Sequence, residues 1–362
     1  MIDDVIIGGA TVDRAQSIEA PSRTPVIPLF SGPVDALLLA AEWSFRQVYW
    51  RNSRLRGWIK RAKSKKAPAA QFADRQALME HLQAIGVTPG SLVMAHTSVS
   101  GLSLTADDSL TGKAANSMEV AQDLVSLLTA MVGETGTLVM PTHPIYKARS
   151  GSTAATVHPT PPIYNPLTTP CGVGLANELF WRQSGTLRSR FPHNTLAARG
   201  PLATELLHDN LNESKSLAHG VLSGYYRFCQ RNGLLISVGV PLASCFTLIH
   251  AAEESRDQQW PVKDFFEERD YVVRQQGIDQ TVTIRKTRVE FMMFSLCIRK
   301  LRRDLVRAGI LHEGRVGTVR VDWARSGEIF QFITQRNRTS TYPYFGTSLV
   351  PRKELSDGSC NR

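Results

Sequence analysis

Five of the nine histidines in this 362-residue chain stand where chemistry is most easily arranged. His96, His143, His193, His219 and His250 each fall at the end of an expected strand or in a loop or turn that follows one. Imidazole suits proton transfer because its ordinary pKa of about 6.5 lies near neutral pH. In an open α/β sheet, sites form outside the carboxyl ends of the strands, so these positions predict one shared site. Any one of them can also be a hydrogen-bonded structural residue.

The stretch TLRSRFPHNTLAARG, residues 186–200, gathers arginines around a histidine. His193 stands between a proline and Asn194, and Arg188 and Ser189 lie just upstream. A guanidinium group matches the geometry of a phosphate, so this density of donors favours a site that holds an anionic ligand and moves a proton. The alternatives are a packing role for His193 and hydrogen bonds from Arg188 and Ser189 to loop carbonyls.

A second pattern, HAAE, places Glu253 three residues after His250. On a helix this spacing brings the carboxylate beside the imidazole, where it can orient the ring or act as a base itself. The zinc signature HExxH, the nucleophile elbow GxSxG, the Walker loop and GxGxxG are all missing from the sequence, and the five cysteines form no CxxC pair. We therefore expect no metal and no nucleotide bound by those motifs.

Helices and strands alternate along the part of the chain that must position these residues. This order predicts an α/β fold with a central mixed, partly parallel sheet flanked by helices. Asp74 is expected to cap one helix, and Asn116 with Glu119 has the spacing of a capping box before another. SLVMAH, GTLVMPT and GLLISVGV are predicted as buried strands, GLANELFWRQSG and TLIHAAEESRD as helical, and SLTADDSLTGKAANS as a polar loop.

Residues 260–323 alternate apolar and polar side chains in DYVVRQ, QTVTIRKTRVEF and GRVGTVRVDW. This period predicts antiparallel strands added at an edge of the sheet near the C-terminus. FSLCIRKLRRDLVRAG, which lies between them, is expected to be a helix. The chain from residue 339 onward is expected to be loop or disorder.

The formal net charge of +10 favours anionic partners. Residues 46–66 contain nine basic residues and no acid, and tryptophans stand at 43, 50 and 58. A helix over residues 34–66 therefore suits an anionic membrane interface, although a surface helix with a solvated basic face has the same composition. Four prolines make residues 1–33 an irregular lead-in, and KSKKAPAA is typical of a linker. We divide the chain into an extension over 1–67, a main domain over 68–335 and a tail over 336–362.

No apolar run reaches the roughly 20 residues that a membrane-spanning helix needs. The first residues carry acids where a secretory signal carries lysine or arginine, and the cysteine count is odd and unpatterned. These features predict a cytoplasmic protein, with peripheral binding at the inner face of the membrane left open.

Four segments in order resemble the aminoglycoside 3-N-acetyltransferase family. They are LMEHLQAIGVTPGSLVMAHTSVSGLS, AQDLVSLLTAMVGETGTLVMPTH, TPCGVGLANELFWRQSGTLRSRFPHNTLAARG and LLISVGVPLASCFTLIHAAEE. The resemblance covers about residues 75–255 and extends more loosely to about 325. It implies an antibiotic N-acetyltransferase-like fold, distinct from that of the commonest acetyltransferase superfamily. It also implies acetyl-CoA as co-substrate and transfer of its acetyl group to a sugar amine in a ternary complex.

The resemblance also implies roles for the candidate residues. His250 and Glu253 match HLAE of the family and are expected to form the catalytic base, with His193 as a second candidate. The remaining assignments divide by ligand: His96, Thr97, Ser98, Arg188 and Ser189 are expected to contact the thioester, pantetheine or phosphates of CoA, and His143, Asn194 and His219 the sugar.

The sequence departs from the family where the family has RSLHPTHS and this chain has RSRFPHNT. Phe191 replaces the first family histidine and Asn194 the second, and His193 lies between them. This form resembles divergent members linked to bacterial surface-polysaccharide genes. Together with the basic charge, it leads us to expect a nucleotide-activated or lipid-linked sugar as acceptor and acyl transfer to its amino or hydroxyl group.

Three other interpretations stay open at this stage. The first is acetylation of an aminoglycoside, although a polycation is repelled by a chain of charge +10. The second is a degenerate acyltransferase that binds CoA without turnover, and the third is a module that only binds membranes. Nucleic acid is not an expected partner, because the basic clusters lie far apart and no binding motif accompanies them. A homodimer is compatible with the sequence but is not predicted by it.

Overall fold

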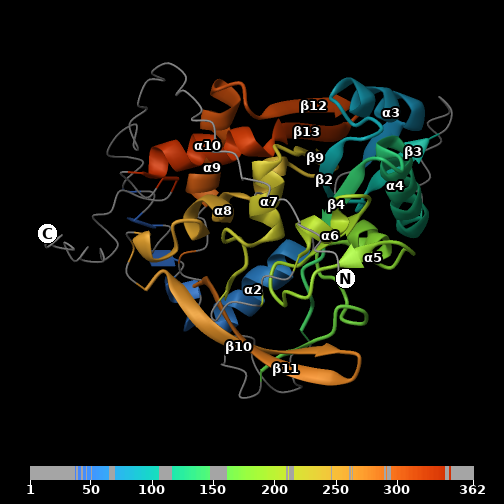
Figure 1. Cartoon of the computed structure of the whole chain (residues 1–362). Coiled ribbons are helices and arrows are strands. Elements are labelled where there is room, and N and C mark those ends of the chain that lie inside the picture. Colours follow the sequence, from blue (N-terminus) through green and yellow to red (C-terminus); the bar gives the residue numbers. More distant parts are fainter. Residues whose placement is uncertain are drawn as a thin grey trace, which may run out of the picture.

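The fold, shown in Figure 1, comes from a computed structural model of the whole chain. The structure describes residues 51–64, 70–105, 116–146, 161–208, 211, 216–245, 247–260, 262, 264–288, 291, 295–338 and 342–343, together with 37, 40, 41, 44, 45 and 47–49.

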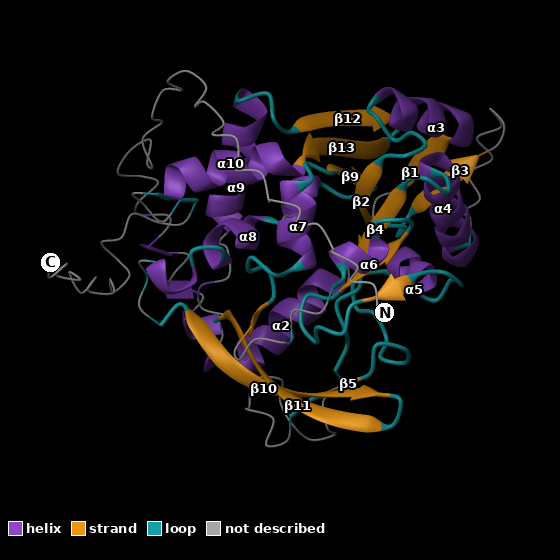
Figure 2. Ribbon diagram, viewed as in Figure 1, coloured by secondary structure: helices purple, strands orange, loops and turns teal. Residues whose placement is uncertain are grey.

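A seven-stranded sheet forms the centre of the fold, with the strand order β12-β13-β9-β2-β4-β7-β6 (Figure 2). The inner strand β2 pairs in parallel with both β4 and β9, and every other neighbouring pair is antiparallel. The sheet is therefore mixed and partly parallel, as predicted. Its strands are β2 (Leu92–Thr97), β4 (Thr137–Pro141), β6 (Leu187–Arg188), β7 (Leu196–Arg199), β9 (Leu234–Val238), β12 (His312–Val316) and β13 (Val319–Arg325).

The continuous apolar runs of β2, β4 and β9 follow from burial on both faces. Successive side chains of a strand point to opposite faces, so Val93 and Ala95 enter one apolar cluster while Met94 enters the other. The same alternation places Leu234 and Leu235 of β9 in opposite clusters. These strands are thus the middle layer of three.

Helices cover both faces of the sheet. The apolar cluster on one face takes side chains from α3 (Arg75–Ala84), α4 (Ser117–Val132) and α5 (Leu175–Trp181). The cluster on the other takes them from α6 (Ala203–Leu206), α7 (Gly224–Gln230), α8 (Ile249–Glu254), α9 (Ser295–Arg307) and α10 (Ser326–Asn337). This helix–sheet–helix arrangement confirms the predicted fold class.

A smaller four-stranded sheet has the order β5-β10-β11-β8. Its strands are β5 (Ile163–Tyr164), β8 (Ser216–Leu217), β10 (Phe266–Gln275) and β11 (Ile278–Thr287). The predicted position of the β10–β11 strands at the edge of the main sheet is wrong, because β10 pairs with β5 and β11 with β8. The β12–β13 hairpin does extend the edge of the main sheet, through antiparallel pairing of β13 with β9.

The predicted helix starts are confirmed by their caps. The Asp74 carboxylate accepts a hydrogen bond from the backbone N–H of Ala77 before α3, and the Asn116 side chain accepts one from Met118 before α4. Part of the expected polar loop is instead strand β3 (Leu102–Thr105), which pairs in parallel with β1 (Gln71–Asp74). The strand β7 and the helices α7 and α10 were not predicted from the sequence.

In the N-terminal region the structure describes α2 (Ser53–Ser64) and separate helical residues between 37 and 49. The predicted lead-in over 1–33, residues 65–69 of the linker, residues 106–115 of the polar loop and nearly all of the tail lie outside the described residues. Among the helices that the structure describes, none has the length and apolar character that crossing a bilayer requires.

Candidate active site

The strand directions bring three of the five histidines to one edge of the main sheet. His96 is the last residue but one of β2, at its carboxyl end, and His143 follows β4 by two residues. Because β7 runs antiparallel to β4, with Leu196 opposite Pro141, the loop before β7 reaches this same edge and carries His193 with it. Segments about 50 residues apart in the sequence are therefore brought to the carboxyl ends of the parallel strands, where a site is expected.

The other two histidines come from elements outside the main sheet. His219 follows β8 of the smaller sheet, and His250 lies in α8 after β9. Their rings lie 5.3 Å apart between centroids. His219 also lies close enough to His143 and His193 to act on their charge, and His96 acts on His143. All five histidines thus belong to one electrostatically connected cluster.

His250 and Glu253 form the predicted pair within one turn of α8. The His250 Nδ1 lies 3.0 Å from Glu253 Oε2, and the glutamate side chain is fully buried. A carboxylate can only accept at this contact, so Nδ1 carries the hydrogen and Nε2 is left as the basic atom. Burial opposes the charged form of His250, but Glu253 and then Glu254 outweigh it and raise the pKa of the imidazole.

A second histidine–glutamate pair lies beside the first. Glu254 accepts the His219 Nδ1–H at 2.8 Å and the His219 backbone N–H at 2.5 Å. The His219 Nε2 is then an acceptor, and the Asn194 side-chain amide lies 3.2 Å from it. Sequence reasoning missed Glu254, because adjacent residues on a helix point in different directions and only the fold shows what the second carboxylate meets.

The remaining histidines are held neutral by their surroundings. Burial lowers the pKa of His96 to about 4 and, with the charges of His219 and His96, lowers that of His143 to about 3. His143 Nε2 lies 3.2 Å from the hydroxyl of Tyr225, a buried residue of α7 that sequence reasoning also missed. Burial, followed by the positive charge of Lys286, lowers the pKa of His193 well below its ordinary value.

The loop that carries His193 is packed through the residues where the chain departs from the family pattern. Phe191 is buried in the apolar cluster beneath the smaller sheet, and its backbone N–H donates to Ser189 Oγ at 3.1 Å. Asn194 has a φ of 49°, in the left-handed region that asparagine tolerates better than most residues. Among the described residues, none forms a hydrogen bond to the His193 ring. The packing of Phe191 and the hydrogen bond to Ser189 thus hold the loop that carries this imidazole.

Arg188 is fixed by contacts within the protein. Its guanidinium donates to the carbonyl oxygens of Thr169, at 2.6 Å, and of Thr142, at 2.8 Å. It also stacks on the Trp181 ring, with 4.3 Å to the centroid. Hydrogen bonds to loop carbonyls were the alternative to phosphate binding, and through them Arg188 joins β6 to the segments after β4. Its predicted contact with a phosphate stays a prediction, as does that of Ser189.

The end of β2 is held by a buried asparagine. The Thr97 hydroxyl lies 3.2 Å from Asn177 Oδ1, and the Asn177 amide donates to the Pro141 carbonyl at 2.7 Å. Ser98 donates its backbone N–H to the Val238 carbonyl at 3.0 Å, which joins the ends of β2 and β9. Thr97, Ser98 and His96 therefore lie together at the edge where the histidines gather.

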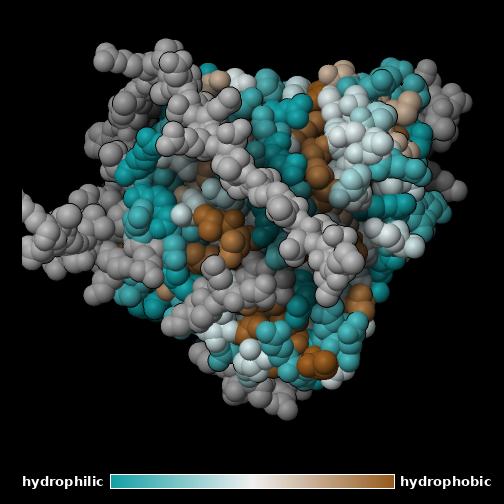
Figure 3. Space-filling view, viewed as in Figure 1, coloured by the Kyte–Doolittle hydropathy of each residue, from teal (hydrophilic) through white to brown (hydrophobic). Residues whose placement is uncertain are grey.

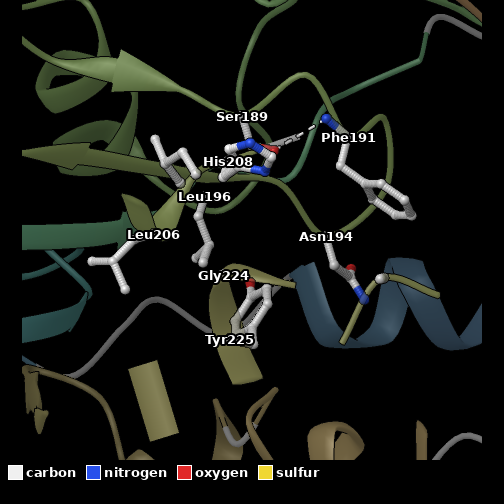
Figure 4. A pocket seen from close by; sticks show the side chains of 10 residues that line it. Ser189, Phe191, Asn194, Leu196, Leu206, His208, Gly224 and Tyr225 are labelled. Atoms are coloured by element: carbon white, nitrogen blue, oxygen red, sulfur yellow. Dashed lines mark hydrogen bonds between the residues drawn. The ribbon is translucent and has the colours of Figure 1, made fainter. Parts of the chain in front are cut away.

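A pocket opens beside this cluster (Figure 4). Asn194 and Tyr225, which contact His219 and His143, form part of its wall. The rest of the lining comes from the chain that runs from β6 to just past α6 and from the segment between β8 and the start of α7. These residues are Ser189, Phe191, Leu196, Leu206, Leu207, His208, Ala218 and Gly224. Within the part of the chain that the structure describes, no group of three or more histidine, cysteine or acidic side chains is arranged to hold a metal ion.

Comparisons with known proteins identify the family of the chain. The model of the family "Aminoglycoside 3-N-acetyltransferase" matches residues 94–337, more than half of the chain. Over 193 residues the chain is 30% identical to aminoglycoside N(3)-acetyltransferase III of Salmonella sp., a match that spans 51% of this chain and only 61% of the relative. It is 25% identical over 279 residues to aminoglycoside N(3)-acetyltransferase IX of Micromonospora chalcea, covering 71% of this chain and 91% of the relative.

Solved structures share the fold. Aminoglycoside acetyltransferase AAC(3)-Xa superposes with a TM-score of 0.58 at 24% identity, over 73% of this chain and 92% of its own. AAC-IIIb, solved in a binary complex with CoASH, gives 0.56 at 20% identity, over 73% and 96%. AAC-VIa bound to sisomicin gives 0.55 at 21% identity, over 72% and 95%. These identities are low, so the structural likeness concerns the fold, and the family follows from the sequence match. The chain belongs to the aminoglycoside 3-N-acetyltransferase family.

Proposed function

We propose that this protein transfers an acetyl group from acetyl-CoA to an amino or hydroxyl group of a sugar. The observation that carries the proposal is the His250–Glu253 pair, in which a buried carboxylate fixes the tautomer of an imidazole within the histidine cluster. Membership of the acetyltransferase family and the CoASH complex of a protein with the same fold support the choice of acetyl-CoA.

In the proposed reaction His250 is the general base. The acceptor nitrogen or oxygen attacks the thioester carbonyl, His250 Nε2 takes its proton, the new bond to the acetyl carbon forms and the carbon–sulfur bond breaks. The proton then passes to the departing thiolate, which restores neutral His250. Glu253 keeps Nδ1 protonated throughout and stabilises the transient imidazolium, a role for which a buried carboxylate is suited.

His193 serves better as a hydrogen-bonding residue than as the base. Its lowered pKa makes the neutral ring a weak proton acceptor near pH 7, and no described residue forms a hydrogen bond to it. We assign it, with His143, Asn194 and His219, to the acceptor side of the site. His96, Thr97 and Ser98 are assigned to the acetyl-CoA side, where the end of β2 lies at the sheet edge.

For the acceptor, the comparisons favour an aminoglycoside. The relatives are named for that activity, and a neighbour of the same fold is bound to sisomicin. One observation of this chain favours an anionic sugar, such as a nucleotide-linked or lipid-linked amino sugar, as a second candidate. Arg269 places positive charge near His193, whereas Lys286, which also acts on His193, is ion-paired with Glu267. The carboxylates of Glu253 and Glu254 are buried and bonded to histidines.

The deciding experiment follows release of the CoA thiol. The protein is incubated with acetyl-CoA and, in separate reactions, with a panel of aminoglycosides and a panel of nucleotide-linked amino sugars. Thiol release that is lost in His250→Asn supports acyl transfer, and the panel that is turned over identifies the acceptor class. If calorimetry detects CoA binding but no CoA thiol is released with either panel or with a lipid-linked sugar, the protein binds CoA without turnover.

A further inference from the structure

Apolar side chains face solvent along the N-terminal helical residues. Leu37, Ala41, Phe45 and Val48 are helical and exposed, and on a continuous helix their spacing of four, four and three residues would place them on one face. The exposed fractions of the three large side chains are 71% for Leu37, 51% for Phe45 and 55% for Val48. Exposed apolar stripes of this kind are costly in water unless another surface covers them.

The same region continues into a basic segment. Residues 46–66 hold nine lysines and arginines and no acid, and Arg51 and Arg54 are exposed. In α2, Arg54 and Trp58 lie four residues apart on one face, and 63% of Trp58 is exposed, whereas Leu55 and Ile59 are partly buried. An exposed indole between cations is typical of helices at the headgroup level of a bilayer.

We propose that residues 37–58 form a docking surface for an anionic lipid membrane, with the apolar stripe at the acyl boundary and the arginines on lipid phosphates. Exposed apolar residues also occur elsewhere, such as Ile278 at 72%, and Figure 3 shows apolar patches separated by hydrophilic areas on the face in view. Charge distinguishes the N-terminal surface. A protein partner would not require the acid-free basic stretch that begins at Arg46, and a nucleic acid would not require the apolar stripe.

This docking surface is independent of the proposed acetyl transfer. None of its residues belongs to the histidine cluster, so loss of membrane binding and loss of catalysis can be separated by measuring both in each variant. The surface would place the enzyme at a membrane face whether its acceptor is dissolved or lipid-linked.

The test is sedimentation of the full chain with vesicles of phosphatidylcholine alone or of phosphatidylcholine with phosphatidylglycerol. Binding is expected only with the anionic vesicles, and it should weaken as salt is raised. The variant Arg51→Gln/Arg54→Gln should bind about 30-fold more weakly, since each cation near an anionic surface contributes roughly a fivefold gain. Phe45→Ser and Trp58→Ser should also weaken binding, with unchanged thermal unfolding.

Matched controls remove the same chemistry elsewhere. Arg299→Gln/Arg307→Gln takes two exposed charges from α9, and Ile278→Ser removes an exposed apolar side chain from the first position of β11. Both should bind anionic vesicles as the unmodified chain does. Equal loss of binding in Arg51→Gln/Arg54→Gln and in Arg299→Gln/Arg307→Gln would mean that only the overall charge matters. That result, equal binding to neutral and anionic vesicles, or no binding to either would overturn the proposal.

Discussion

Replacing Glu253 by glutamine should separate catalysis from folding. The side chain is fully buried, with one oxygen on His250 Nδ1 at 3.0 Å and the other, Oε1, without a hydrogen-bond partner among the described residues. Losing a charge-assisted hydrogen bond costs about 1.5–3 kcal/mol, but removing a buried charged oxygen without a partner returns about 1–3 kcal/mol. The free energy of unfolding in denaturant should therefore change little.

The rate should fall much further. Glutamine presents an amide that can turn either its oxygen or its NH₂ toward Nδ1, so the tautomer with a basic Nε2 is no longer enforced. A positioned general base contributes about 10²–10⁴-fold, which corresponds to about 2.7–5.4 kcal/mol of activation free energy. We expect kcat in the thiol-release assay to drop within that range.

The pH profile provides a second, independent measurement. The base works only when neutral, so the acidic limb of kcat/KM should follow the raised pKa of His250 and lie above pH 6.5, with activity rising as pH increases through it. The glutamine variant removes the charge that raises this pKa, and its limb should move to lower pH. Glu254→Gln is the comparison variant: it removes the carboxylate bonded to His219 and only the weaker of the two influences on His250, so its limb should move less than that of Glu253→Gln. An unchanged rate and an unchanged limb in Glu253→Gln would refute the assignment of His250 as base.

Further variants test how the site is held. His219→Phe keeps an aromatic ring against Tyr225 but loses the hydrogen bonds of the imidazole to Asn194 and Glu254. In steady-state assays the KM for the acceptor should therefore rise more than kcat falls. The free energy of unfolding of Asn194→Ala, measured in denaturant, should be about 1–2 kcal/mol below that of Asn194→Gly, because only glycine accepts the positive φ without strain. Arg188→Lys should lower the unfolding midpoint, because lysine cannot serve both carbonyls and stack on Trp181.

Local features of the fold were predictable from the sequence. Asp74 and Asn116 cap helices through their own side chains, and the buried strands β2, β4 and β9 are continuous apolar runs. Each of these features can be recognised from a few consecutive residues of the sequence. The strand β7, by contrast, is the four residues LAAR, too short and too mixed to show a period. The β10–β11 hairpin was recognisable by its alternation, but alternation cannot say which sheet a hairpin joins.

The contacts of the candidate site are likewise of two kinds, local in the sequence and distant in the sequence. His250 and Glu253 are three residues apart, and helix geometry alone brings them together, so the sequence by itself determined this pair. The contacts of His219 with Glu254, 35 residues away, and with Asn194, 25 residues away, exist only in the folded chain. The tertiary structure decided them because a sequence displays spacing along the chain, whereas contacts between distant segments depend on strand order and direction.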